Sequence, residues 1–182
     1  ILILFGSCVK YLDPLPNGDL SDEGLWKYQE RVQGLIGQCY DYMPRLYNDN
    51  EGVYLDGAAD NAVITSSTHA MRRLATGSLT TGQDPFLTYW DRDYKAIRLV
   101  NTFLKDRKGY NTKYLVREDY NNLVRRRLQG DAFALLAWFQ WDLLQKFGGK
   151  GVDGQMLGFP IITEPVTDVT GVNLKRNSYD EC

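Results

Sequence analysis

The chain has 182 residues, 43% of them hydrophobic, and a formal net charge of -2 at pH 7. This length and apolar content suffice for a sizeable buried core and exclude a chain that is disordered throughout. The charge argues against a nucleic-acid partner, because the densest cationic cluster, residues 125–127, would be spread around a helix and provides no broad basic surface.

The first eight residues are typical of the end of a bacterial export signal. Five bulky apolar residues lead into Gly6, Ser7 and Cys8, which resembles the site where a lipoprotein signal peptide is cut before a lipid-modified cysteine. Five residues are too few to span a membrane, which needs about 20. Residues 1–8 are therefore predicted to be a residual signal peptide with Cys8 as the lipidation site, and residues 9–24 a linker. A short buried N-terminal strand with an ordinary cysteine is the alternative.

Helices are predicted along most of the remaining chain. The first begins at a cap on Asp19 or Ser21 and ends near Met43, before Pro44. The second begins after Pro85 and places Asn101 in its buried seam. A buried amide must be hydrogen-bonded, so we expect Asn101 to bridge to a neighbouring helix or to a loop backbone.

The third predicted helix runs from about Arg117 to Phe147. Apolar side chains occupy most of its circumference after Gln129, which predicts a central helix and not a surface one. Its two tryptophans and that of the second helix are interpreted as core residues: Trp90, Trp138 and Trp141. The glycines that follow, Gly148 and Gly149, are predicted to supply a left-handed residue at the helix end, and Pro160 to lie in an extended exit segment.

An irregular region, from residue 48 to residue 84, is predicted between the first two helices. Residues 52–60 are compatible with one short strand, and residues 59–61 with a turn. Residues 65–84 form a predicted long loop that holds the single histidine, His69, together with Arg72 and Arg73. Both a binding loop and an insertion with a solvated charge pair fit this segment.

A disulfide between Cys39 and Cys182 is a further possibility that the sequence leaves open.

Taken in order, several motifs resemble the SusD/RagB family of outer-membrane lipoproteins. They follow the relaxed lipobox at Cys8: Tyr-Leu-Asp at 11–13, Ala-Asp-Asn at 59–61, Tyr-Trp-x-x-x-Tyr-x-x-Ile-x-x-x-Asn at 89–101, Gly-Asp-Ala-Phe at 130–133 and Phe-Gly-Gly at 147–149. The chain departs from the family in Asp131, where Glu is usual, in Leu136 and Ala137, where Arg-Ala is usual, and in a longer segment after Gly149.

The resemblance implies a mainly α fold with tetratricopeptide-like helix packing and a loop-rich portion, of which residues 25–182 are the N-terminal part of a longer domain. It also implies a lipid-anchored protein on the outer face of the outer membrane. Such proteins capture oligosaccharides, or peptides in some branches, as the lid of a SusC-like TonB-dependent transporter, without enzymatic activity. Neither a cofactor nor a metal site is expected, because one histidine and three cysteines without ligand spacing make no such centre.

Sugar binding needs aromatic planes for pyranose faces and polar side chains for hydroxyl groups. On this basis His69, Arg72, Arg73 and Tyr89 are the predicted ligand-binding residues. Two alternatives stay open at this point. One is a soluble helical adaptor that binds proteins, and the other is a glycosidase, because the separation of a carboxylate pair cannot be deduced from sequence.

Overall fold

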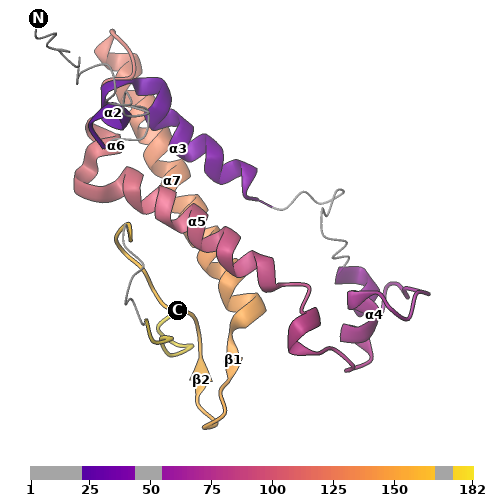
Figure 1. The fold of residues 1–182 in the computed structure, drawn as a ribbon. Coiled ribbons are helices and arrows are strands. Elements are labelled where there is room, and N and C mark those ends of the chain that lie inside the picture. Colours follow the sequence, from indigo (N-terminus) through magenta and orange to yellow (C-terminus); the bar gives the residue numbers. More distant parts are fainter. Residues whose placement is uncertain (1–21, 44–54, 167–173) are drawn as a thin grey trace, which may run out of the picture.

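The computed structural model describes residues 22–43, 55–166 and 174–182. These residues form an elongated, mostly helical structure in which three helices lie side by side: α3 (Gln29–Asp41), α5 (Leu87–Leu104) and α7 (Glu118–Phe147) (Figure 1). The mainly α fold expected from the sequence is thereby confirmed. Cys8, the linker up to residue 21 and residues 48–54 lie outside the described residues.

One core joins the three helices. Each contributes side chains at helical spacing, and these pack into a single cluster because each helix turns one apolar stripe toward the other two. The cluster contains Val32, Ile36 and Cys39 from α3, Ile97, Val100 and Phe103 from α5, and Leu128, Leu135, Phe139 and Leu143 from α7.

The first predicted helix is broken in two, which corrects the continuous helix expected up to Met43. A short α2 (Asp22–Lys27) is separated from α3 by Tyr28, whose backbone is extended (φ -119°, ψ 120°). The Arg31 side chain spans the break, because it donates a hydrogen bond to the Gly24 carbonyl (3.2 Å) and lies over the Tyr28 ring at 4.7 Å. The break gives α2 a direction different from that of α3 (Figure 1).

The longest helix, α7, has 30 residues and spans roughly 45 Å. Its predicted length is confirmed, but its predicted burial is only partly correct. Leu135, Phe139 and Leu143 form the stripe that is buried, whereas Phe133 and Trp141 are each 53% exposed. Trp141 is therefore not a core residue, because no described element covers that side of α7. Trp90 and Trp138 do pack against the core.

The end of α7 differs from the predicted left-handed cap. Gly148 is extended (φ -68°, ψ 145°), because the chain continues directly into a small antiparallel hairpin of β1 (Gly149–Lys150) and β2 (Met156–Leu157). The next segment returns along α5, as predicted for the extended region around Pro160. There the Tyr94 hydroxyl donates to the Pro160 carbonyl and the Asn101 amide to the Ile162 carbonyl, both at 2.8 Å. The prediction for Asn101 is thereby confirmed.

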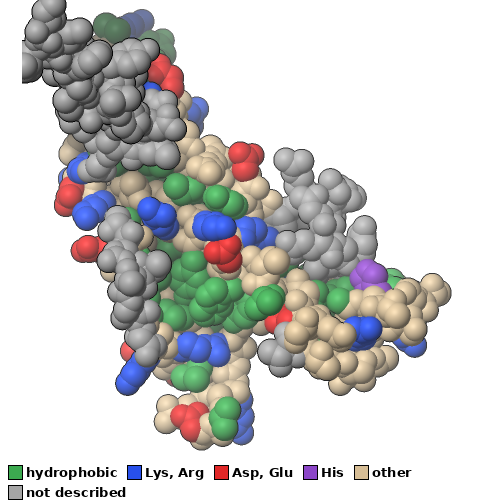
Figure 2. Space-filling view, in the orientation of Figure 1, with side chains coloured by type: hydrophobic (Ala, Val, Ile, Leu, Met, Phe, Trp, Pro, Cys, Tyr) green, Lys and Arg blue, Asp and Glu red, His purple; other side chains and the backbone are tan. Residues whose placement is uncertain are grey.

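Hydrophobic side chains gather in the middle of the molecular face shown in Figure 2, between the α5 side and the hairpin. Half-buried residues that pack against the core include Tyr94, Leu144 and Ile161. Cys39 and Cys182 are free thiols, which excludes the disulfide left open above. The Cys182 thiol instead hydrogen-bonds the backbone of Phe159 (3.4 Å) and ties the described C-terminal residues to the returning segment.

A small lobe precedes α5. It contains η1 (Leu55–Ala58), α4 (Ala70–Ala75) and η2 (Thr81–Gln83). The turn predicted at residues 59–61 is confirmed, but residues 55–58 are a 3-10 helix and not a strand. The loop predicted at 65–84 is likewise interrupted by α4, which follows its N-cap residue His69. This six-residue helix is too short for an apolar periodicity to be recognised in the sequence.

After α5 the chain reverses through η3 (Lys105–Arg107) into α6 (Lys108–Asn111). Asp106 and Arg107 both have left-handed backbones (φ 53° and 56°), which produces the sharp turn. The buried Asn121 side chain then fixes the path into α7, because its Oδ1 accepts hydrogen bonds from the backbone N–H of Tyr114 (2.8 Å) and of Leu115 (3.2 Å).

Candidate ligand-binding site

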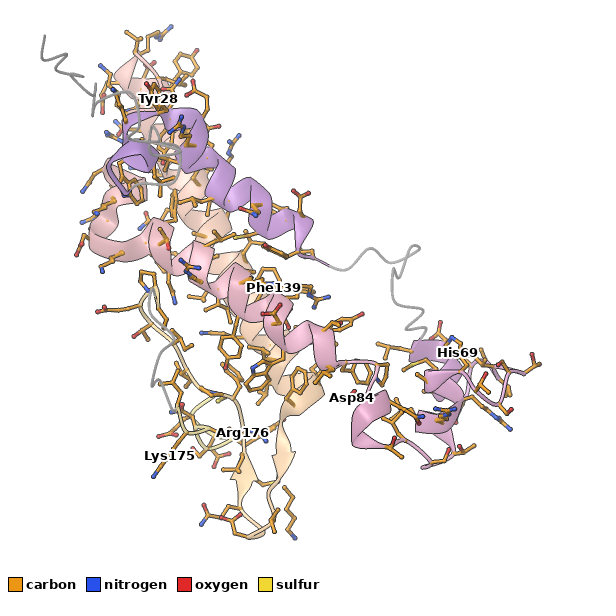
Figure 3. All side chains as sticks on the ribbon, viewed as in Figure 1. Tyr28, His69, Asp84, Phe139, Lys175 and Arg176 are labelled. Atoms are coloured by element: carbon orange, nitrogen blue, oxygen red, sulfur yellow. The ribbon has the colours of Figure 1, made fainter. Side chains whose placement is uncertain are left out.

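Three of the four predicted ligand-binding residues lie together in the small lobe. His69 is the N-cap of α4, and its Nδ1 accepts a hydrogen bond from the Met71 backbone N–H (3.2 Å). Arg72 and Arg73 follow within α4, and all three side chains are half-buried. His69 is seen in this lobe, away from the three long helices (Figures 2 and 3).

The fourth predicted residue, Tyr89, lies in the first turn of α5 and is only 4% exposed. It packs against Met71 of α4, which brings the lobe against the end of the helical core. Its ring faces two cationic groups of the protein itself, the Arg92 guanidinium at 3.9 Å and the Lys146 ammonium at 4.7 Å. Contact between these four residues and a ligand stays a prediction.

Tyr89 adjoins a buried charge cluster between α5 and α7. Arg92 contacts Asp93 Oδ1 at 2.7 Å and Asp142 Oδ2 at 2.8 Å, and Lys146 pairs with the other oxygen of Asp142. The Asp93 side chain is fully buried, and its Oδ2 lacks a partner among the described residues. The pKa of Asp93 is raised to about 7 as the net result of three effects: burial, the largest, raises it, the neighbouring Arg92 lowers it, and Asp142 raises it.

A pocket lies at the opposite end of the molecule, between the α2–α3 junction and α6. It has a volume of about 530 Å³, within the usual range of ligand pockets. An indole, two amides, a hydroxyl and three ammonium groups line it. Its lining consists of Trp26, Lys27, Gln29, Lys108, Asn111, Thr112 and Lys113. We call it the lysine pocket.

Local structure explains the position of these side chains. The extended Tyr28 aims α2 across the end of α3, which places Trp26 and Gln29 on opposite sides of the break. The far wall is held by Arg125 of α7, which donates hydrogen bonds to the Thr112 carbonyl (3.0 Å) and to the Asn111 carbonyl (3.3 Å). Both walls are thus anchored to the long helices.

Sequence reasoning missed the lysine pocket. Trp26 and Lys113 are far apart in the chain, and their proximity depends on the break at Tyr28 and on the reversal before α6. One local signal was available, namely the cluster of basic residues from Lys105 to Lys113, beside a tyrosine and an asparagine. An aromatic ring with a few polar or charged groups nearby is a combination found in ligand pockets.

Two further features bear on the class of site. Among the described residues, no three side chains of His, Cys, Asp or Glu are grouped in a way that would hold a metal ion. A search of the same residues for membrane-spanning helices found none with the required length and hydrophobicity.

Comparison with known proteins identifies the family of the chain. Residues 10–182 match a SusD-like family described as "Starch-binding associating with outer membrane". The chain is also similar to the SusD-like protein P38 of Formosa agariphila, with 26% identity over 156 residues. That alignment covers 82% of this chain but 28% of the relative, so the chain spans less than a third of the relative's length. No solved structure matches. The match over nearly all of its residues shows that the chain belongs to the SusD-like family, whose members are starch-binding proteins associated with the outer membrane.

Proposed function

We propose that the chain is part of a surface-exposed outer-membrane lipoprotein that captures oligosaccharides and acts as the lid of a SusC-like TonB-dependent transporter. The observation that carries this proposal is the family match over residues 10–182, together with the family's description as starch-binding. In this role the protein holds sugars and transfers them onward without cleaving them.

The lysine pocket supports a sugar-binding role at the level of chemistry. A flat indole such as that of Trp26 suits the apolar face of a pyranose ring. The amides of Gln29 and Asn111 each offer both donors and acceptors for hydroxyl groups. His69, Arg72, Arg73 and Tyr89 stay in the proposal as a second set of sugar contacts on the lobe side of the molecule.

The proposal includes a lipid anchor on Cys8. Two or more acyl chains give stable anchoring, because each buried methylene contributes about 0.8 kcal/mol and a single chain binds only reversibly. Labelling of cells with radioactive palmitate tests the anchor. We expect label in the full-length protein, loss of label in Cys8→Ala, and protein exposed to protease added outside the cell. An unlabelled product in the cytosol would instead favour the soluble adaptor.

Ligand binding is tested by calorimetry on the full-length protein with three hexasaccharides: maltohexaose, hexagalacturonate and a sulfated galactose hexamer. We expect at least one to bind without being shortened, and Trp26→Ala to weaken it by roughly tenfold or more, as for a central aromatic anchor. Trp141→Ala is the matched control, because Trp141 is 53% exposed on another element. Absence of binding to all three sugars, or cleavage of any, would contradict the proposal.

A further inference from the structure

The longest helix, α7, is covered on one side by the described elements. α3, α5 and α6 pack against it, and Leu135, Phe139 and Leu143 form its buried stripe. The opposite side is exposed over about three turns. Its residues recur three or four positions apart and so lie on one helical face. We call this the outer face of α7, and it consists of Gly130, Phe133, Ala134, Ala137 and Trp141.

The outer face is uncharged along its whole length. The two acids in the same stretch of α7 are turned toward other helices: Asp131 interacts with Tyr40 of α3, and Asp142 pairs with Arg92 of α5. Apolar side chains therefore continue around the helix from the buried stripe to the exposed side. A helix that is apolar around most of its circumference is normally buried on all sides, so we expect the outer face to be covered in the complete protein.

A small pocket adjoins the outer face at Phe133. It has a volume of about 170 Å³, and apolar side chains form most of its lining, beside one guanidinium and one amide. Such a pocket accepts an apolar side chain from whatever covers α7, as pockets at the centre of protein interfaces do. Its lining consists of Phe103, Leu104, Arg107, Tyr110, Gln129 and Phe133.

We propose that the outer face of α7 and the adjoining pocket dock an amphipathic helix of the same protein, from the part of the full-length chain outside residues 1–182. Docking of this kind concerns how the protein assembles and does not depend on which sugar it binds.

The length of the SusD-like relative supports an occupant from the same protein. The 156 aligned residues make up 28% of that relative, so more than two thirds of it lies outside the aligned region. A segment of the same chain is also favoured over a second molecule, because its covalent connection gives it a high effective concentration at the face.

The shape of the outer face favours a helix as the occupant. Gly130, Ala134 and Ala137 carry at most a methyl group, so a second helix axis can approach to about 8 Å, the short end of helix packing distances. Phe133 and Trp141, each 53% exposed, supply the apolar area that such a helix would bury. An added strand would need a free sheet edge, which a helix surface does not offer.

Photo-crosslinking from position 141 of the full-length protein identifies the occupant. Trp141→p-benzoylphenylalanine keeps an aromatic side chain and forms a covalent bond with a neighbouring group under ultraviolet light. We expect mass spectrometry to find it attached to a peptide of the same molecule from outside residues 1–182, with apolar residues three or four positions apart. Val152→p-benzoylphenylalanine, at a fully exposed position between the two strands of the hairpin, is the control and should not label that peptide.

The double variant Ala134→Glu/Ala137→Glu tests the same face by stability. Burying carboxylates without partners is unfavourable, so trypsin should cleave the full-length variant roughly tenfold faster or more than the wild type. Ala75→Glu is the matched control, because Ala75 is an exposed alanine at the end of α4, and it should be cleaved at the wild-type rate. Substitutions that keep the face apolar, such as Gly130→Ala and the Trp141→Ala control above, should leave the helix docked.

The proposal requires both results. A cross-link from position 141 to a second copy, to another protein or to residues 1–182 would refute it, and so would the absence of any cross-link. Cleavage of the double variant at the wild-type rate would show that the face stays exposed and would also refute it. Sugar binding is not measured in either experiment, so the docking of this helix and the proposed function can fail separately.

Discussion

Asp93→Asn is the most informative change in the buried charge cluster. The amide keeps an oxygen that accepts the hydrogen bond of Arg92, which Asp93 Oδ1 accepts at 2.9 Å. It also places an N–H group on the side of Asp93 Oδ2, the buried oxygen that has no partner among the described residues. The variant therefore resembles the protonated acid and cannot acquire a buried negative charge.

The expected effect on stability depends on pH. Burial raises the pKa of Asp93 from its ordinary value of 3.8 to about 7 in the folded protein. The folded state then binds more protons than the unfolded state between these values, so the contribution of Asp93 is fully present below pH 4 and is lost as the pH rises through 7. A difference of about 3 pH units corresponds to about 4 kcal/mol, which is an upper limit for this single group.

Urea denaturation of the full-length protein, followed by tryptophan fluorescence, measures this effect. Relative to the wild type, we expect the free energy of unfolding of Asp93→Asn to rise by about 2 to 4 kcal/mol between about pH 4 and about pH 8. Asp91→Asn is the control, because Asp91 is on the same helix but its side chain is 70% exposed. A wild type and an Asp93→Asn variant with the same dependence on pH would refute the reasoning.

Three further predictions concern packing and thiol chemistry. Gly109→Ala should lower the free energy of unfolding by about 1 to 3 kcal/mol, because the added methyl would lie within 2.4 to 2.6 Å of the buried Phe103 ring. Gly130→Ala should instead raise it by about 1 kcal/mol, since that position in α7 has open space around it; equal melting temperatures for the two variants would contradict both. Burial raises the pKa of the Cys39 thiol to about 12, so mass spectrometry after alkylation at neutral pH should show Cys182 modified first and Cys39 only on unfolding.

Local sequence signals were sufficient where a helix carries its own boundaries. Pro85 marks the start of α5, and Gly148 and Gly149 mark the end of α7. Within each of these two helices, the spacing of apolar residues in the sequence matches the observed helix. Asn101 could be predicted for a related reason. A polar residue within an apolar stripe has to find a partner, and the structure supplies the Ile162 carbonyl.

The errors arose where a neighbouring element decides the outcome. Apolar periodicity cannot tell which of two stripes on α7 will be covered, so Trp141 was assigned to the core although it is 53% exposed. The extended Gly148 reflects the hairpin that follows it, and the break at Tyr28 depends on contacts of Arg31 across it. The lysine pocket could not be predicted, because segments distant in sequence form its two walls.

The single extended residue at Tyr28 separates two tasks within the first helical segment. Val32 and Ile36 of α3 are buried in the core, whereas Leu25 and Trp26 of α2 pack against that core half-buried, and Trp26 also lines the lysine pocket. The extended backbone at Tyr28 therefore lets one segment both pack on the bundle and turn an indole toward the pocket. A substitution that fused α2 and α3 into one helix would leave α3 in the bundle but would turn the Trp26 indole away from the pocket.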